Sequence, residues 1–554
     1  MKKRIGSLVM AISLVVSTFS ACDGLFHKHV FSKEMKADAV SHWFECECGK
    51  KSQVQEHIPG GMVQKDATYH WYSCSVCGED VGVTEHTYSE DWKHNSSAHW
   101  HVCECGQKEE VIKHTGGEAT CTEKATCSDC GVQYGKVSGH NYGNLIELES
   151  GEMGYACACG DSIALLSKEN ADGNREGGLV DFVVDVEEGR DPVILHLSDT
   201  QFTDSQMEDK CFKYVRETIQ ATNPDLIIIT GDLVYGRFDK TGKLFTDFIA
   251  FMEGFKIPWA PVFGNHDNEC WKGVDWQCEQ LEGAEYCLFE QGQVTGNGNY
   301  TVGITQGNEL LRVFYMMDSN GCSNPRVYGD GTNVTTNPEV TPGKNQVKTS
   351  AGFGDDQTAW FKNCSNDISS VSPDTKHSVA FHIQLSYFVK AYAQYDYSGH
   401  IKDGGSSSEL KYALDLSKKQ MINTETWTVE KELEVKDGDI GFLGRTMKGA
   451  WDTSYSVYSV MKGAGVDSLF VGHEHCNSAS VVFDGVRFQF AQKSSTYDRY
   501  NSLNSKGEIV GSYSNAGTPL IGGTAFYLSQ TDGAIVNPYI YLYGNPLRTN
   551  PSNR

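Results

Sequence analysis

Three short apolar runs between Ile194 and Asp267 decide the fold: VILHLSDTQF at residues 193–202, LIIITGDLVYG at 226–236 and IPWAPVFGNHD at 257–267. Runs of this length, bounded by Gly, Pro and Asp, predict buried strands. Segments long enough for helices lie between them, at roughly 206–222 and 242–255. The alternation of strands and helices predicts a parallel sheet, in which ligands bind beyond the carboxyl ends of the strands.

Polar residues follow each of these runs where the strand should end, and two later runs repeat the arrangement. The later runs are SVAFHIQL at 378–385 and VDSLFVGHEH at 466–475. Oxygen and imidazole donors of this kind suit Zn, Fe, Mn or Ni, and the set is too large for one ion but suits two. The donors are, in chain order, Asp199, Asp232, Asn265, His382, His473 and His475.

The motifs D-x-Q, GDLVY, GNHD, VAFH and GHEH follow one another within residues 191–546. In this order they resemble the calcineurin-like metallophosphoesterase superfamily and, within it, the purple acid phosphatase-like branch. The resemblance implies an α/β (α+β) fold class, with a two-sheet sandwich flanked by helices. It also implies a metal-dependent hydrolase that cleaves phosphate esters, with phosphomonoesters of small molecules favoured, by attack of a metal-activated hydroxide.

The resemblance assigns roles to individual residues. Asp232 would bridge two active-site ions, which would be Fe, Zn or Mn. His266 would protonate the leaving oxygen, and Asp267 would orient that imidazole. The remaining ligands would be Asp199 and His475 on the first ion, and Asn265, His382 and His473 on the second.

One position departs from the broader superfamily. Gln201 stands where a His is common, and an amide oxygen is a poorer donor. Tyr235, three residues after Asp232, matches the metal-bound Tyr of the GDxxY motif in purple acid phosphatases. Either Gln201, Tyr235 or water would complete the first ion, and Tyr235 could equally pack beside the site.

Composition and the N-terminus bear on where the protein works. A formal net charge of −25 argues against nucleic-acid binding. Residues 1–21 have the basic start and apolar centre of a signal peptide, and Cys22 after small residues resembles a bacterial lipidation site. We therefore expect an exported lipoprotein anchored in the membrane through Cys22 on the bacterial cell surface; an ordinary cleaved signal would make it secreted.

Residues 22–163 repeat a Cys/His pattern in units shorter than thirty residues, and a polar stretch at 164–190 predicts a linker to the 191–546 domain. Units this small cannot bury enough apolar surface to fold without a metal or disulfide. Two Cys and at least two His per unit favour structural Zn, although export keeps disulfides open. The predicted ligands are His42, Cys46, Cys48, His57, His70, Cys74, Cys77, His86, His99, Cys103, Cys105, His114, Cys121, Cys127, Cys130 and His140.

The repeats contain none of the predicted catalytic residues, so a spacer or an array that contacts the cell wall is the expected role. Two other hypotheses stay open. The repeats could make the chain a cell-surface binding protein with a vestigial phosphatase fold, or a metal-scavenging lipoprotein. The intact set of donors at the strand ends favours the enzyme.

Overall fold

A computed structural model of the chain describes residues 28–169, 175–176, 178–203, 211–320, 327–329, 332–334, 352–395, 397, 410–444, 455–498, 500–505, 509–512 and 518–542. The predicted signal peptide and Cys22 lie outside these residues. Contacts divide the chain into a small unit, Met1–Gly139, and a large unit, His140–Arg554. Among the described helices, none is both long and apolar enough to cross a membrane.

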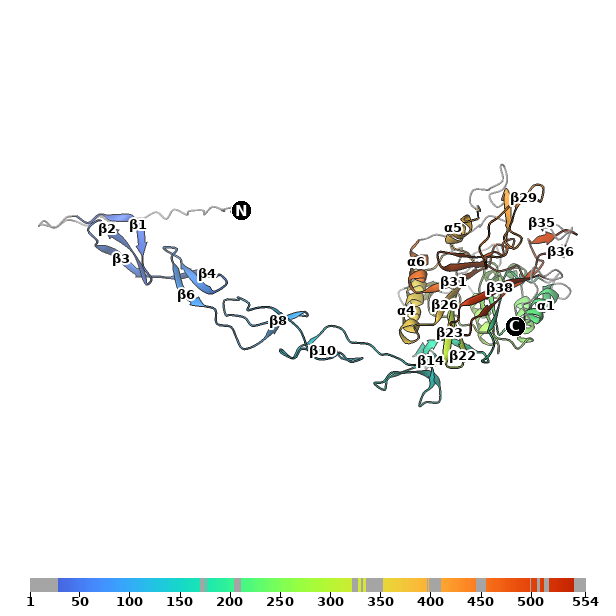
Figure 1. Cartoon of the computed structure of the whole chain (residues 1–554), viewed down its shortest axis with the longest axis horizontal. Coiled ribbons are helices and arrows are strands. Elements are labelled where there is room, and N and C mark those ends of the chain that lie inside the picture. The colour runs from blue at the N-terminus through green and yellow to red at the C-terminus, as the bar shows by residue number, and fades with distance from the viewer. Residues whose placement is uncertain are drawn as a thin grey trace. The chain divides into compact units, whose positions relative to one another are not determined.

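The small unit is built from short antiparallel sheets, one for each sequence repeat (Figure 1). In the first three repeats the middle strand carries the His-Trp pair. The sheets are β1 (Phe31–Ala37), β2 (Ser41–Cys46) and β3 (Lys51–Glu56); β4 (Pro59–Lys65), β5 (Tyr69–Cys74) and β6 (Asp80–Glu85); β7 (Lys93–His94), β8 (Ala98–Trp100) and β9 (Ile112–Lys113); and β10 (Ala125–Thr126) with β11 (Gln133–Tyr134).

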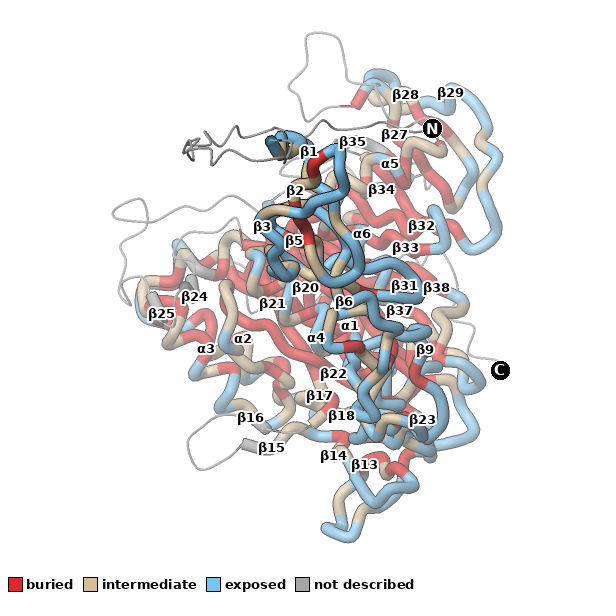
Figure 2. Tube along the Cα trace, turned by 90° about the vertical axis from the view of Figure 1, so that its left-hand side faces the viewer, coloured by how far each residue is buried: buried red, intermediate tan, exposed pale blue. Residues whose placement is uncertain are grey.

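These sheets bury little apolar surface. None of the three hydrophobic clusters of the described chain includes a residue before Leu145. Figure 2 shows the contrast. Strands β3 and β6 are mostly exposed, whereas three strands of the large unit are mostly buried: β20 (Leu226–Thr230), β31 (Val466–Val471) and β33 (Val486–Phe490). The repeats therefore lack a packed core, as their length predicts.

The large unit contains two large sheets. One has five strands in the order β21 (Trp259–Val262), β20 (Leu226–Thr230), β19 (Val193–Leu197), β37 (Gly522–Leu528), β38 (Ile535–Leu542). The other has seven, in the order β18 (Phe182–Asp185), β22 (Asn299–Gln306), β23 (Glu309–Met317), β26 (Lys376–Ala380), β31 (Val466–Val471), β33 (Val486–Phe490), β32 (Ser480–Phe483). Strands β19, β20 and β21 are parallel, as are β23, β26, β31 and β33.

Strand β23 shows why the sheets form a sandwich. Phe314 and Met316 join the hydrophobic cluster shared with β19, β20 and β21, whereas Val313 and Tyr315 join the cluster on the opposite face. Successive side chains of a strand point to opposite faces, so a strand that is apolar throughout must be covered on both sides. The predicted mixed α/β fold with several sheets and few helices is confirmed.

The two helices expected between the first three strands are present. They are α1 (Phe212–Thr222) and α2 (Lys243–Glu253), and both contribute side chains to the cluster of the five-stranded sheet. The other helices are α3 (Val274–Glu282), α4 (Asp355–Val371), α5 (Tyr387–Ala393) and α6 (Tyr455–Gly463). The second cluster packs beneath α4, α5 and α6.

The stretch predicted as a linker, 164–190, contains strands that join the sheets of the large unit. Strand β17 (Gly178–Val180) pairs with β14 (Ser162–Leu166), and β18 forms the edge of the seven-stranded sheet. Leu165, Leu179 and Val180 lie in the second hydrophobic cluster, which explains why this polar stretch folds with the large unit.

The remaining strands form small peripheral sheets. They are β12 (Ile146–Glu147), β13 (Met153–Ala156), β15 (Lys168–Glu169), β16 (Arg175–Glu176), β24 (Val327–Gly329), β25 (Thr332–Val334), β27 (Tyr412–Asp415), β28 (Gln420–Asn423), β29 (Thr428–Glu432), β30 (Phe442–Leu443), β34 (Asn501–Leu503), β35 (Ile509–Ser512) and β36 (Thr518–Pro519).

Candidate active site

The six predicted active-site ligands come together at the carboxyl ends of five parallel strands, β19, β20 and β21 of one sheet and β26 and β31 of the other. Asp199, Asp232 and His473 have positive φ angles of 53°, 53° and 69°. A left-handed conformation costs a non-glycine residue about 1–3 kcal/mol, and such strain is typical of functional sites. Backbone hydrogen bonds between the strand-end loops maintain it, for example from the Asp199 N–H to the carbonyl of Gly231 at 3.0 Å.

Two motif glycines allow these loops to approach one another. A Cβ atom on Gly264, in GNHD, would collide with the carboxylate of Asp232, and one on Gly472, in GHEH, would collide with Ser198 beside Asp199. Each glycine therefore makes room for a ligand from a different motif.

Asn265, His382 and His473 form one group of donors. The Asn265 Oδ1 atom lies 3.0 Å from His382 Nε2 and 2.9 Å from His473 Nδ1. His382 donates its Nδ1–H to the carbonyl of Thr230 at 2.7 Å, so Nε2 is the ring nitrogen that faces the other donors. That nitrogen also lies 3.5 Å from Asp232 Oδ1. Several lone pairs that converge in this way favour a cation between them.

Asp199 and His475 form the second group. The His475 Nδ1 atom lies 3.2 Å from the carboxylate of Asp498, and its Nε2 atom lies 3.1 Å from Asp199 Oδ1. That oxygen is buried, and no backbone N–H or hydroxyl group of the described residues donates to it. Burial raises the pKa of Asp199, but His475, His382 and Lys493 outweigh burial and hold the pKa well below its usual range. A buried, ionised carboxylate oxygen beside an imidazole fits a pair of metal ligands.

Asp232 lies between the two groups. Its Oδ1 accepts a hydrogen bond from the backbone N–H of His266 at 2.9 Å, and its Oδ2 accepts one from Gln201 Nε2 at 3.0 Å. Burial raises its pKa, but His382 and His266 lower it below the usual range, so Asp232 is an anion. The predicted bridging position is therefore occupied by a charged, oriented carboxylate.

The structure shows the contacts of Gln201 and Tyr235, the two alternative ligands of the first ion. The Gln201 Oε1 atom accepts a hydrogen bond from Lys493 Nζ at 3.1 Å, so its amide is engaged on both sides. Lys493 is buried and was not found from the sequence, because no motif surrounds it. The ring of Tyr235 stacks on His266, with ring centres 4.1 Å apart, and burial raises the pKa of Tyr235 to about 12.

His266 is half-buried beside the donors, and a residue that the sequence analysis did not single out holds it. Glu269 Oε2 lies 3.1 Å from His266 Nδ1. Burial lowers the pKa of His266, but Asp232 and Glu269 outweigh burial and raise it to about 9. The ring therefore carries a proton near neutral pH, as a general acid requires.

The expected role of Asp267 changes. Its carboxylate accepts hydrogen bonds from the backbone N–H groups of Gly264 at 2.7 Å and Val234 at 3.1 Å, whereas the carboxylate bonded to the His266 ring is that of Glu269. These two hydrogen bonds of the buried Asp267 join the GNHD loop to the GDLVY loop. Glu269 is in the position to orient the His266 ring.

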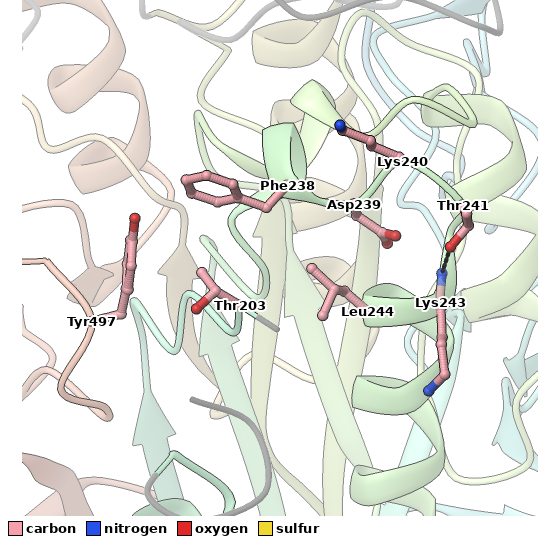
Figure 3. A pocket seen from close by; sticks show the side chains of 8 residues that line it. All are labelled: Thr203, Phe238, Asp239, Lys240, Thr241, Lys243, Leu244 and Tyr497. Carbon is pink, nitrogen blue, oxygen red and sulfur yellow. Dashed lines mark hydrogen bonds between the residues drawn. The ribbon is translucent and has the colours of Figure 1, made fainter. Parts of the chain in front are cut away.

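A pocket of about 630 Å³ opens close to these residues. Figure 3 shows the rings of Phe238 and Tyr497 on one side and Lys240, Thr241 and Lys243 on the other. The Tyr497 ring centre lies 5.2 Å from that of Tyr235. The Tyr235 ring stacks on His266 and meets Tyr497 edge-on, so these three rings lead from the donors to the pocket.

The predicted ligands of the small unit also assemble, but not within single repeats. We number the repeats 29–56, 57–85, 86–113 and 114–139. His42 and Cys46, expected in one site, lie four residues apart on β2, which is about 13 Å along a strand. His42 instead lies with three ligands of the second repeat, and its Nδ1 atom is 3.8 Å from Cys74 Sγ.

The same pairing recurs in the next two repeats. His70 lies with His86, Cys103 and Cys105, and His99 lies with His114, Cys127 and Cys130. Cys46 and Cys48 lie with His29. In the large unit, His140 lies with Cys157 and Cys159, and its Nδ1 atom is 3.3 Å from Cys159 Sγ. The Cys/His groups of the N-terminal region could therefore bind metal, and the strand geometry corrects which residues share a site.

Residues 192–477 match the family described as calcineurin-like phosphoesterase, so the chain belongs to that family. This range contains all six strand-end ligands, His266 and Glu269. Members of the family use divalent metals, and the donors described above fit them.

Among curated proteins, the chain is similar to the phosphatase DCR2 of Saccharomyces cerevisiae (strain ATCC 204508 / S288c). The two are 26% identical over 146 residues, which is 26% of this chain and 25% of that protein, so the match spans only a quarter of the relative.

Two solved structures resemble parts of the chain. One is TT1561 of Thermus thermophilus, with a TM-score of 0.26 and 10% identity over 55% of this chain and 90% of that one. The other is the modular autolysin LytC from Streptococcus pneumoniae, with a TM-score of 0.13 and 9% identity over 63% of this chain and 52% of that one. At these TM-scores neither likeness bears on the fold or the function.

Proposed function

We propose that the large unit hydrolyses phosphate monoesters of small molecules with two metal ions held at the strand ends. The observation that carries the proposal is the convergence of buried carboxylate, amide and imidazole donor atoms at the strand ends. Asn265 Oδ1 lies 3.0 Å from His382 Nε2 and 2.9 Å from His473 Nδ1, and Asp199 Oδ1 lies 3.1 Å from His475 Nε2. Membership of the calcineurin-like phosphoesterase family supports the same reaction class.

Asp199, His475 and Asp232 would hold one ion, and Asn265, His382, His473 and Asp232 the other. When bound, the ions would be Fe, Zn or Mn, and they would activate water and neutralise the phosphoryl oxygens. The protein fixes the ligand atoms in advance, because carbonyl or carboxylate groups hold the far nitrogens of His382 and His475.

His266 would protonate the leaving oxygen. Glu269 fixes the ring through Nδ1, so Nε2 is the nitrogen that presents the proton. Lys493 keeps Gln201 in place, and Gln201 in turn holds Asp232. The leaving group would enter the pocket beside Tyr497 and Phe238, whose rings favour an aromatic or apolar group.

The test is hydrolysis by the full-length chain of an aryl phosphate and of a bis-aryl phosphodiester, with metal content measured on the same sample. We expect faster turnover of the monoester and two metal ions bound by the large unit. No hydrolysis of either compound by a metal-loaded chain contradicts the enzyme and returns attention to a binding role of the repeats.

Whether Tyr235 binds a metal would distinguish the purple acid phosphatase-like branch from the rest of the family. If it binds a ferric ion, as in purple acid phosphatases, the protein has a broad visible absorption band that disappears in Tyr235→Phe. A colourless, active protein with zinc or manganese leaves Tyr235 as the ring that supports His266.

We further propose that the chain is exported and anchored through Cys22, with the repeats as a spacer that contacts the cell wall. The basic and apolar start of the sequence supports this. Metabolic labelling with a fatty acid tests it, with Cys22→Ser as the control that should abolish the label.

A further inference from the structure

We propose that the small unit binds three zinc ions, each held by ligands from two consecutive repeats, so that the ions join one repeat to the next. In each site the earlier repeat supplies one His, and the later repeat supplies the other His and both Cys. The three sets are His42, His57, Cys74 and Cys77; His70, His86, Cys103 and Cys105; and His99, His114, Cys127 and Cys130.

The spacing of the ligand atoms matches a tetrahedral zinc site. Zn–N bonds of about 2.0–2.1 Å and Zn–S bonds of about 2.3 Å place two nitrogens about 3.3 Å apart and a nitrogen and a sulfur about 3.6 Å apart. In the third set, His99 Nδ1 lies 3.3 Å from His114 Nδ1 and 3.6 Å from Cys127 Sγ. The Nδ1···Sγ distances in the other two sets are 3.3 and 3.8 Å.

In each set, the same backbone hydrogen bond orients one imidazole so that its Nδ1 atom can bind zinc. His57, His86 and His114 place their Nε2 atoms 2.7, 3.0 and 2.9 Å from the backbone carbonyls of Asp38, Asp66 and Asn95. A carbonyl only accepts, so Nε2 carries the proton and Nδ1 offers its lone pair to the other ligands.

The residues that present these carbonyls recur in each repeat as well. The Oδ1 atom of Asp38 accepts from the backbone N–H groups of Val40 and Ser41, at 3.0 and 2.9 Å. Asp66 and Asn95 make the equivalent turns. Each turn lies in the earlier repeat and receives a His from the later one, so the supporting hydrogen bond crosses the same junction as the ligands.

The first repeat is the exception that this arrangement predicts. Cys46 and Cys48 have His29 beside them, with His29 Nδ1 3.1 Å from Cys48 Sγ. Within the described residues this group has three ligands, and no described middle strand lies before β1 to supply another His.

Sharing a site across a junction has a consequence for stability. The described repeats have no hydrophobic cluster of their own, so little apolar packing opposes their separation. In repeat arrays, stability is roughly a sum of the repeats and the interfaces between neighbours. Here the metal would supply the interface term.

Pairs of substitutions in the full-length chain test the sharing. The chain is purified with Zn²⁺, and zinc per chain is counted by elemental analysis and native mass spectrometry. His70→Ala with Cys103→Ala removes two ligands of one shared site, so we expect the loss of about one ion. His70→Ala with Cys74→Ala, within one repeat, touches two shared sites and should lose about two ions.

Sites confined to single repeats would reverse these two results, and that reversal overturns the proposal. His94→Ala is the matched control, since His94 is an exposed histidine outside the three sets and should keep all the zinc. His70→Cys, which offers a thiolate from the same position, should also keep it; loss of all small-unit zinc in that variant overturns the proposal. A wild-type chain whose measured mass shows disulfides and whose small unit holds no zinc would also overturn the proposal.

Discussion

The two units of this protein use the same side chains, imidazoles fixed by hydrogen bonds at the far nitrogen, in opposite ways. In the large unit His382 and His475 follow strands whose apolar residues are almost all buried in a two-sheet core. In the small unit His57 and His86 follow strands of sheets that have no hydrophobic cluster. The core positions the ligands in the large unit, whereas the ligands must position the sheets in the small one.

The ligands of a metal site therefore do not show by themselves whether the metal serves catalysis or stabilises the fold. What separates the two cases is the source of the free energy that holds the ligands in place. Burial stabilises by about 25 cal/mol per Å² of apolar surface, and the large unit has that surface. A repeat shorter than thirty residues does not.

Removal of the metals should produce the largest difference between the two units. We expect a chelator to abolish phosphate ester hydrolysis, with recovery when the metal is returned, while the thermal unfolding transition of the large unit persists. In the same sample, the repeats should become sensitive to protease at their junctions. Measuring both in one chain makes the contrast direct; repeats that stay resistant in chelator would break it.

Asp232→Asn should cause the next largest effect. The substitution keeps the shape but removes the charge between the two donor groups, and kcat/KM should fall by about 10²–10³-fold. Asp484→Asn, at an exposed carboxylate paired with Lys462, is the control and should keep full activity. Zinc in the small unit should be unchanged in both variants.

Asp498→Asn tests whether support of a ligand matters where the fold already holds it. Asp498 lies 3.2 Å from His475 Nδ1, and loss of its charge should weaken metal binding about 10–100-fold. The midpoint of activity in a metal titration measures this, and saturating metal should restore most of the rate. An unchanged midpoint would mean that the core alone fixes His475.

Glu269→Gln should have the smallest effect. Glu269 raises the pKa of His266, so its neutralisation lowers that pKa. The general acid works when protonated, and activity is lost as pH rises through its pKa. The alkaline limb of the pH–rate profile should therefore move to lower pH, with a rate loss of about tenfold at most at neutral pH, a part of what general acid catalysis contributes. A limb that does not move would exclude His266 as the acid.

Much of the active site could be predicted because its ligands end strands that sequence patterns reveal. Asp199, Asp232 and Asn265 follow apolar runs, and parallel strands bring their ends to one edge of a sheet. Glu269, Lys493 and Asp498 could not be predicted, since each acts through a neighbour and has no periodic pattern around it. Glu269 lies in a single 3-10 turn, and the other two lie in loops. Asp267 illustrates the limit from the other side: its motif was recognised, but its hydrogen bonds show a different role.

The sequence by itself determined the strands, the order of the motifs and the kinds of donor atoms, because these depend on local apolar patterns and on side-chain chemistry. Only the tertiary structure decided which donors meet. Three contacts join residues more than thirty positions apart in the sequence. They are the close approach of Gly264 to Asp232, the hydrogen bond from Lys493 to Gln201, and the contact between His42 and Cys74. Such contacts depend on how sheets pack and which face a strand presents, and no local pattern encodes them.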